Sequence, residues 1–156
     1  MSIAGRVVRR PITADQTDHE GMTTMRFMML MYPGAKGESG ALPGDDAIAE
    51  MMKFNEQLTK AGVLLALDGL HPTAKGARLR LVNGARAITD GPFGETEEVI
   101  GGYWLIQVRS RDEALAWASR APLAEDEMIE LRQVYEMSDF SDHAQQLAAP
   151  VRDALT

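Results

Sequence analysis

The chain has 156 residues, a net charge of −7, and no cysteine. Its length suits one domain with short extensions, and its 45% hydrophobic content is enough to form a packed core. The acidic composition without a lysine or arginine cluster disfavours nucleic-acid binding, and the lack of cysteine excludes disulfides, thiolate metal sites and thiol nucleophiles.

Residues 1–24 form a polar segment of mixed charge ahead of the first apolar stretch. No apolar core of the kind found in signal peptides follows its arginines, and no stretch approaches the roughly 20 apolar residues of a membrane helix. We therefore predict a cytoplasmic protein with no membrane partner and an N-terminal extension. The extension is either disordered, or a start-site artefact with translation beginning at Met22 or Met25, or an arm that packs on a partner subunit.

The domain is predicted to span residues 25–140, and its first half follows a strand–helix–strand pattern. The stretch MRFMMLMYPG, residues 25–34, is apolar nearly throughout and predicts a central strand that ends at its Pro-Gly pair. Residues 45–62 place apolar side chains near one face of a helix, and the two aspartates at their start favour a helix N-terminus. The stretch VLLALDGLHP, residues 63–72, predicts a second strand.

The second half adds a hairpin and then repeats the strand–helix–strand pattern. Residues 77–89 surround Asn83–Gly84, which is the strongest short hairpin signal. The stretches GGYWLIQV, SRDEALAWASR and MIELRQVYE predict a buried strand, a helix with a capping box, and a last strand. Residues 141–156 form a C-terminal tail that is predicted to be partly helical, with an interruption at Pro150.

This order of elements predicts the fold class. Strand, helix, strand, hairpin, strand, helix and strand form the split βαβ arrangement of an α+β, ferredoxin-like sandwich with an added β-hairpin. Two helices would cover one face of the sheet and leave the other face apolar. Such a face needs a partner, and a homodimer that packs sheet on sheet supplies one.

The motif DGPF at residues 90–93 is the first candidate for chemistry. Aspartate, glycine and proline are residues that turns require, so the motif can be a turn with Phe93 as a plug for the core. Alternatively, Asp90 is a general acid or base at the mouth of a pocket. His71, at the end of the second predicted strand, is either an exposed histidine or a proton shuttle paired with Asp90 or Asp68.

Two glycines and an arginine are further candidates. Gly101 and Gly102 either admit a bulge and close strand packing or leave bare backbone beside a ligand. In the second case Tyr103 and Trp104 help to line the pocket. Arg132 forms either an interface ion pair or an anchor for a carboxylate ligand.

Neither a cofactor nor a metal is expected. The three histidines share no short ligand spacing, and the acidic run of Glu95, Glu97 and Glu98 lacks the pattern of a calcium loop. The chain also lacks the glycine-rich signatures of nucleotide-binding loops.

The stretches MRFMMLMY, AGVLLALDGLHP, TDGPFGETEEVIGGYWLIQV, SRDEALAWASRAP and IELRQV together resemble the YCII-related family, and its DGPF-domain branch in particular, over about residues 25–140. The resemblance implies a ferredoxin-like fold that dimerises into an α/β barrel. It also implies kinship with small decyclising or dehalogenating enzymes that have a reactive Asp–His pair, and an association with alternative sigma factors. The residues that match the branch motif are Asp90, Gly91, Pro92, Phe93, Gly101 and Gly102.

Together these features predict a small cytoplasmic homodimer with an unidentified small molecule in a pocket near the DGPF loop. Asp90 and His71 are the predicted catalytic residues. The predicted pocket residues are Gly91, Pro92, Phe93, Gly101, Gly102, Tyr103 and Arg132. If the protein is an enzyme, cofactor-free proton transfer of the lyase or isomerase type fits best. The alternative is a non-catalytic binding or regulatory module associated with an alternative sigma factor.

Overall fold

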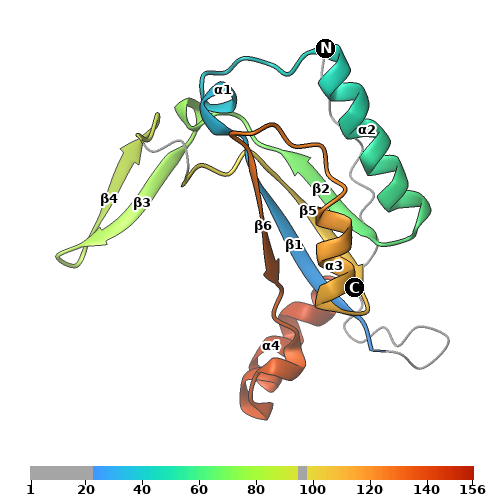
Figure 1. The fold of residues 1–156 in the computed structure, drawn as a ribbon. Helices are drawn as coiled ribbons and strands as arrows, with labels where there is room; N and C mark the ends of the chain where they lie inside the picture. Colours follow the sequence, from blue (N-terminus) through green and yellow to red (C-terminus); the bar gives the residue numbers. More distant parts are fainter. Residues whose placement is uncertain (1–22, 95–97) are drawn as a thin grey trace.

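The computed structural model describes residues 23–94 and 98–156. The predictions for the N-terminal extension therefore lie almost wholly outside the described residues, as do those for Glu95 and Glu97. Within the described ranges the chain forms two antiparallel sheets and four α-helices (Figure 1). The α+β class predicted from the sequence is confirmed.

The main sheet has four strands, and each neighbouring pair is antiparallel. Its strands are β1 (Met25–Tyr32), β2 (Leu64–Gly69), β5 (Gly102–Val108) and β6 (Met128–Gln133). They lie in the order β2-β5-β1-β6, so β5 and β1 occupy the centre. This order is consistent with the predicted ferredoxin-like arrangement, and the described strands of one chain do not close into a barrel.

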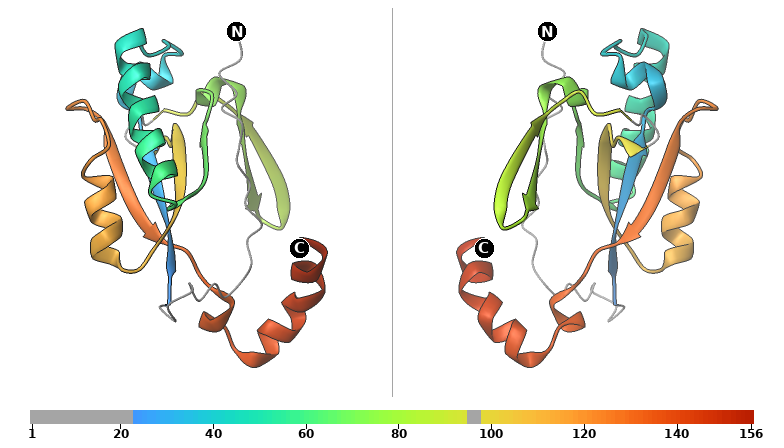
Figure 2. Two further views of the ribbon diagram at one scale, coloured as in Figure 1. Left: turned by 90° about the vertical axis from the view of Figure 1, so that its right-hand side faces the viewer. Right: turned by 90° about the vertical axis from the view of Figure 1, so that its left-hand side faces the viewer.

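Two helices lie on one face of this sheet (Figure 2). Helix α2 (Asp45–Lys60) follows β1 in the chain, and helix α3 (Arg111–Ala118) follows β5. The hydroxyl of Ser110 accepts a hydrogen bond of 3.1 Å from the backbone N–H of Glu113, which stabilises the start of α3. A short helix, α1 (Gly34–Glu38), lies between β1 and α2 in the chain.

The core lies between these two helices and the main sheet. Alternate side chains of β1 and β5 point toward the helices, as strand periodicity requires, and Met29 and Ile106 are fully buried there. Trp104 faces the same way, and its Nε1–H donates to Oδ1 of Asn55 in α2 over 2.8 Å while its ring packs edge-on against Phe54. The other buried core residues are Phe27, Leu58, Val63, Val108 and Ala114.

No described helix or strand covers the opposite face of the main sheet. Its side chains alternate with the core residues along the same strands, and Met28 of β1 lies opposite Leu105 of β5 at its apolar centre. We call this surface the open face. It is made by Arg26, Met28, Leu30, Tyr32, Ala66, Asp68, Tyr103, Leu105, Gln107, Met128, Glu130 and Arg132.

The second sheet is the predicted hairpin. Strands β3 (Ala77–Val82) and β4 (Ala85–Asp90) pair only with each other. Asn83 and Gly84 have φ angles of 49° and 79°, the left-handed backbone of a tight hairpin turn, so the predicted turn is confirmed. Every residue of both strands is exposed. The hairpin stands away from the main sheet (Figure 1).

The chain ends in helix α4 (Asp142–Ala154), which runs through Pro150 without a break. The predicted interruption at this residue is wrong, because only about one turn of helix follows the proline and little of the helix depends on the missing N–H donor. Figure 2 shows α4 and the hairpin on the side of the sheet opposite α2 and α3, so both flank the open face. None of the helices in the described ranges is long and apolar enough to cross a bilayer.

Candidate functional site

The DGPF loop, residues 90–93, leaves the end of β4 and packs against a 3-10 turn, Thr73–Lys75. The N–H of Gly91 donates to the carbonyl of Gly76 over 2.9 Å. Gly91 also lies so close to the carbonyl of Thr73 that a Cβ atom at position 91 would overlap it. The glycine of the motif therefore has a packing role, since only a residue without a Cβ permits this approach.

Thr73 ties the DGPF loop to the first helix. Its Oγ1 accepts a hydrogen bond of 3.0 Å from the N–H of Phe93. Its own N–H and hydroxyl donate to the carboxylate of Glu38 over 2.7 and 2.5 Å. The guanidinium of Arg78 lies 4.0 Å from the centre of the Phe93 ring, which is a cation–π contact. The loop is thus held between α1 and the root of the hairpin.

The hydrogen bonds from the side chain and backbone of Thr73 lower the pKa of Glu38 below its ordinary value of 4.5. Because the pKa is lowered in the folded state, the ionised carboxylate stabilises the protein above pH 4.5, and this stabilisation is lost as the pH falls through the folded value. We therefore expect Glu38→Gln to lower the urea midpoint at about pH 7, and to lower it by less at about pH 4, where part of this stabilisation is already lost.

Glu50→Gln, on the exposed surface of α2, is the matched control and should leave the urea midpoint unchanged at both pH values. A deficit in Glu38→Gln that is equally large at both pH values would contradict the role of the ionised carboxylate.

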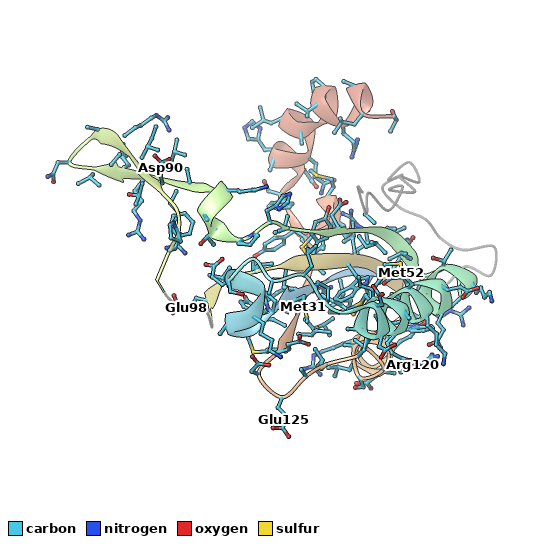
Figure 3. All side chains as sticks on the ribbon, turned by 90° about the horizontal axis from the view of Figure 1, so that it is seen from above. Met31, Met52, Asp90, Glu98, Arg120 and Glu125 are labelled. Atoms are coloured by element: carbon cyan, nitrogen blue, oxygen red, sulfur yellow. The ribbon has the colours of Figure 1, made fainter. Side chains whose placement is uncertain are left out.

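The predicted catalytic residues, Asp90 and His71, are both exposed, and within the described part of the chain they share no hydrogen bond. Figure 3 shows Asp90 out on the hairpin, away from Met31 of the main sheet. Asp68, the other predicted partner of His71, accepts a hydrogen bond from Tyr103.

The space beside the two predicted pocket glycines is filled by neighbouring atoms. A Cβ at Gly101 would lie 2.5 Å from Cγ of Pro33, and one at Gly102 would lie 3.0 Å from a backbone carbonyl of β2. Close packing therefore accounts for glycine at both positions. Arg132 is exposed, and its Nη1 lies 3.6 Å from Oε2 of Glu130, which places it in an ion pair on the open face.

A carboxylate and a phenol meet at one edge of the open face. The hydroxyl of Tyr103 in β5 donates to Oδ2 of Asp68 in β2 over 2.9 Å, and both residues are half-buried. They are direct partners in the strand register, which puts them on the same face. A carboxylate held beside a phenol can take a proton from a bound molecule and return it.

The sequence analysis did not pair Asp68 with Tyr103, although one feature of the sequence indicates a partner for Asp68. Asp68 is the single acid in the apolar stretch VLLALDGL, and a carboxylate in a buried strand requires a hydrogen-bond or ion-pair partner. The partner, Tyr103, comes from a strand that lies beside β2 only after folding. Trp104, predicted to line the pocket with Tyr103, faces the core instead because neighbouring residues of a strand point to opposite faces.

A separate pocket of about 600 Å³ lies where β1 ends and β6 begins, at one edge of the open face. Burial, together with the nearby carboxylate of Glu130, raises the pKa of Tyr32 at this edge. Figure 3 shows Glu125 pointing away from the body of the protein, and no group of three or more described residues could hold a metal ion. The lining residues are Tyr32, Gly34, Ala35, Glu98, Glu125, Asp126, Glu127 and Met128.

Most of the chain is similar to a known protein family. The family model described as the YCII-related domain matches residues 25–138. An uncharacterized protein, R00369, of Rhizobium meliloti (strain 1021) is 38% identical over 96 residues, which are 60% of this chain and 77% of that protein. Residues 25–138 include the main sheet, the hairpin, the DGPF loop and the Asp68–Tyr103 pair.

Proposed function

The chain belongs to the YCII-related family, and on this basis we propose that it is a homodimer that binds a small organic molecule at the edge of the open face. The Asp68–Tyr103 pair carries this proposal, because it places a carboxylate and a phenol, hydrogen-bonded to each other, on a sheet face that no described element covers. The DGPF motif supports assignment to the DGPF branch of the family. The absence of cysteine supports a reducing, cytoplasmic location.

The apolar centre of the open face favours association with a second copy. Met28, Leu30 and Leu105 lie close together on β1 and β5 and point to the uncovered side. A symmetric dimer covers both copies of such a face at once when the two sheets pack against each other. Two four-stranded sheets packed in this way would form the dimeric α/β barrel that the family resemblance implies.

Covering the open face also favours chemistry at the Asp68–Tyr103 pair. A site closed to water strengthens the electrostatic interactions between its polar groups and a bound molecule. Tyr103 orients the carboxylate by donating its single O–H to Asp68. The arrangement suits cofactor-free proton transfer, of the lyase or isomerase type, on a small molecule with an acidic C–H bond.

Thermal-shift screening of wild type, Asp68→Asn and Tyr103→Phe against small organic acids, lactones and cyclic ketones tests this proposal. A ligand at about 100 times its Kd stabilises the folded protein by about 2.7 kcal/mol, and we expect both variants to lose most of this gain. Tyr135→Phe changes a tyrosine that is 75% exposed and should respond like wild type.

An undiminished response in both Asp68→Asn and Tyr103→Phe would refute a binding site at this pair. Stabilisation that depends on the pair but comes with no turnover of any screened compound would identify a binding or regulatory module rather than an enzyme.

A further inference from the structure

The hairpin has one side that is largely apolar. The strand register places Leu79 opposite Ile88 and Leu81 opposite Arg86, so these side chains share one side, with Asp90 on the same side at the root. Leu79, Leu81 and Ile88 are 62%, 72% and 68% exposed. We call this surface the apolar side of the hairpin.

The apolar side of the hairpin has no packing partner in the described part of its own subunit. A two-stranded hairpin alone is at best marginally stable in water, and exposed large aliphatic side chains mark an interaction surface. The root of the hairpin is fixed, because Gly91 packs on Thr73 and the N–H of Phe93 bonds to the Thr73 hydroxyl. Figures 1 and 2 show the hairpin projecting from the main sheet on the side of the open face.

The open face carries a row of side chains that complements this surface. In strand register, Asp68, Tyr103, Leu30 and Glu130 follow one another across β2, β5, β1 and β6. We call them the open-face row, which has an acid at each end and apolar surface between. The acid-lined pocket adds negative charge at the Glu130 end. On its apolar side the hairpin carries one arginine, Arg86, and one aspartate, Asp90, because Arg78 and Arg80 lie on the opposite side.

The dimensions of the two surfaces agree. From Arg86 to Asp90 the strand advances by four residues, which is about 13 Å at the usual rise of a strand. From Glu130 to Asp68 the open-face row crosses three strand spacings, which is about 14 Å. With Arg86 at Glu130, the middle of the strand therefore lies over the apolar part of the row, and Asp90 reaches Asp68.

We infer that the hairpin of one copy lies across the open-face row of the second copy, and that Asp90 completes the Asp68–Tyr103 site of that second copy. This inference rests on the proposed dimer and adds which residues each copy supplies. Asp90 would place a second carboxylate beside the carboxylate of Asp68 and the phenol of Tyr103. Two-fold symmetry gives each dimer two such sites.

Paramagnetic relaxation in mixed dimers tests the contact directly, because the chain has no cysteine of its own to compete for a spin label. Full-length Ala87→Cys, labelled on the side of the hairpin away from its apolar side, is refolded together with isotope-labelled wild-type chain. We expect the amide signals of Leu30 and Tyr103 in the isotope-labelled copy to lose intensity, and those of α2 to keep it. A label at Glu50→Cys, on α2, should leave the open-face signals intact.

The two proposals fail in distinguishable ways. A dimer in sedimentation whose Leu30 and Tyr103 signals stay intact beside the Ala87→Cys label would overturn the hairpin contact and leave the proposed dimer standing. A monomer in sedimentation at the same concentration would overturn both.

A charge exchange tests how the hairpin is aligned on the row. Arg86→Glu places two acids together at the Glu130 end and should weaken dimerisation at least about tenfold, whereas Arg86→Glu with Glu130→Arg in the same chain should restore it. Arg80→Glu changes an arginine on the opposite side of the hairpin and should have little effect. This alignment would be overturned if Arg86→Glu left the dimer dissociation constant unchanged. It would also be overturned if adding Glu130→Arg failed to restore the wild-type value.

Discussion

Replacing Gly91 with alanine should lower the free energy of unfolding by about 3 kcal/mol, the upper part of the range for overpacking a filled site. The added methyl group would overlap the carbonyl of Thr73, which is backbone and cannot rotate away. The DGPF loop would then have to move off the 3-10 turn and lose the hydrogen bond from Phe93 to Thr73. Urea denaturation monitored by circular dichroism measures the loss.

Gly94→Ala is the matched control, because a Cβ atom at this position would meet no atom of the described residues within 4 Å, its chain neighbours aside. We expect its effect on the unfolding free energy to stay within about 0.5 kcal/mol, as for an ordinary surface change. If Gly91→Ala were as mild as Gly94→Ala, the packing of the DGPF loop on Thr73 would not be what requires glycine in the motif.

Leu105→Glu should convert the proposed dimer into a monomer at micromolar concentration. Leu105 lies at the centre of the open face, so in a sheet-on-sheet dimer the new carboxylate would be buried without a partner. An unpaired buried charge costs about 3 kcal/mol, which corresponds to more than a hundredfold in affinity. The effect doubles in free energy because a symmetric interface receives one charge from each copy.

Met52→Glu is the control for this change. Met52 lies on α2 and is 47% exposed, so its replacement adds the same charge outside the proposed interface. Sedimentation should show a dimer for Met52→Glu and a monomer for Leu105→Glu, with circular dichroism showing that both are folded. A Leu105→Glu protein that remains a dimer as tight as wild type would exclude the open face as the interface.

The main features of the fold could be predicted because local patterns specify them. Asn83–Gly84 fixes the hairpin through backbone conformations that other residues rarely adopt. The apolar stretches that became β1, β2 and β5 were recognisable by composition, and the intervening helical pattern gave the order of elements. The open face was also predictable, since two helices can cover only one side of a sheet.

The candidate site was less predictable because its parts meet only after folding. Asp68 and Tyr103 are 35 residues apart in the chain and become neighbours through the pairing of β2 with β5. In the same way, Gly91 can be read from the sequence as a turn residue, but its contact with Thr73 depends on how the hairpin root packs. Within the described part of the chain, neither Asp90 nor His71 forms a hydrogen bond with the Asp68–Tyr103 pair.

The central claim is that a second copy of this chain covers the open face, and sedimentation equilibrium of the wild-type protein tests it most directly. At micromolar concentrations the predicted mass is twice that of the 17.1 kDa chain, and dilution should reveal a reversible return to the monomer. A mass of 17.1 kDa over the whole concentration range would contradict the claim, together with the composite site that depends on it.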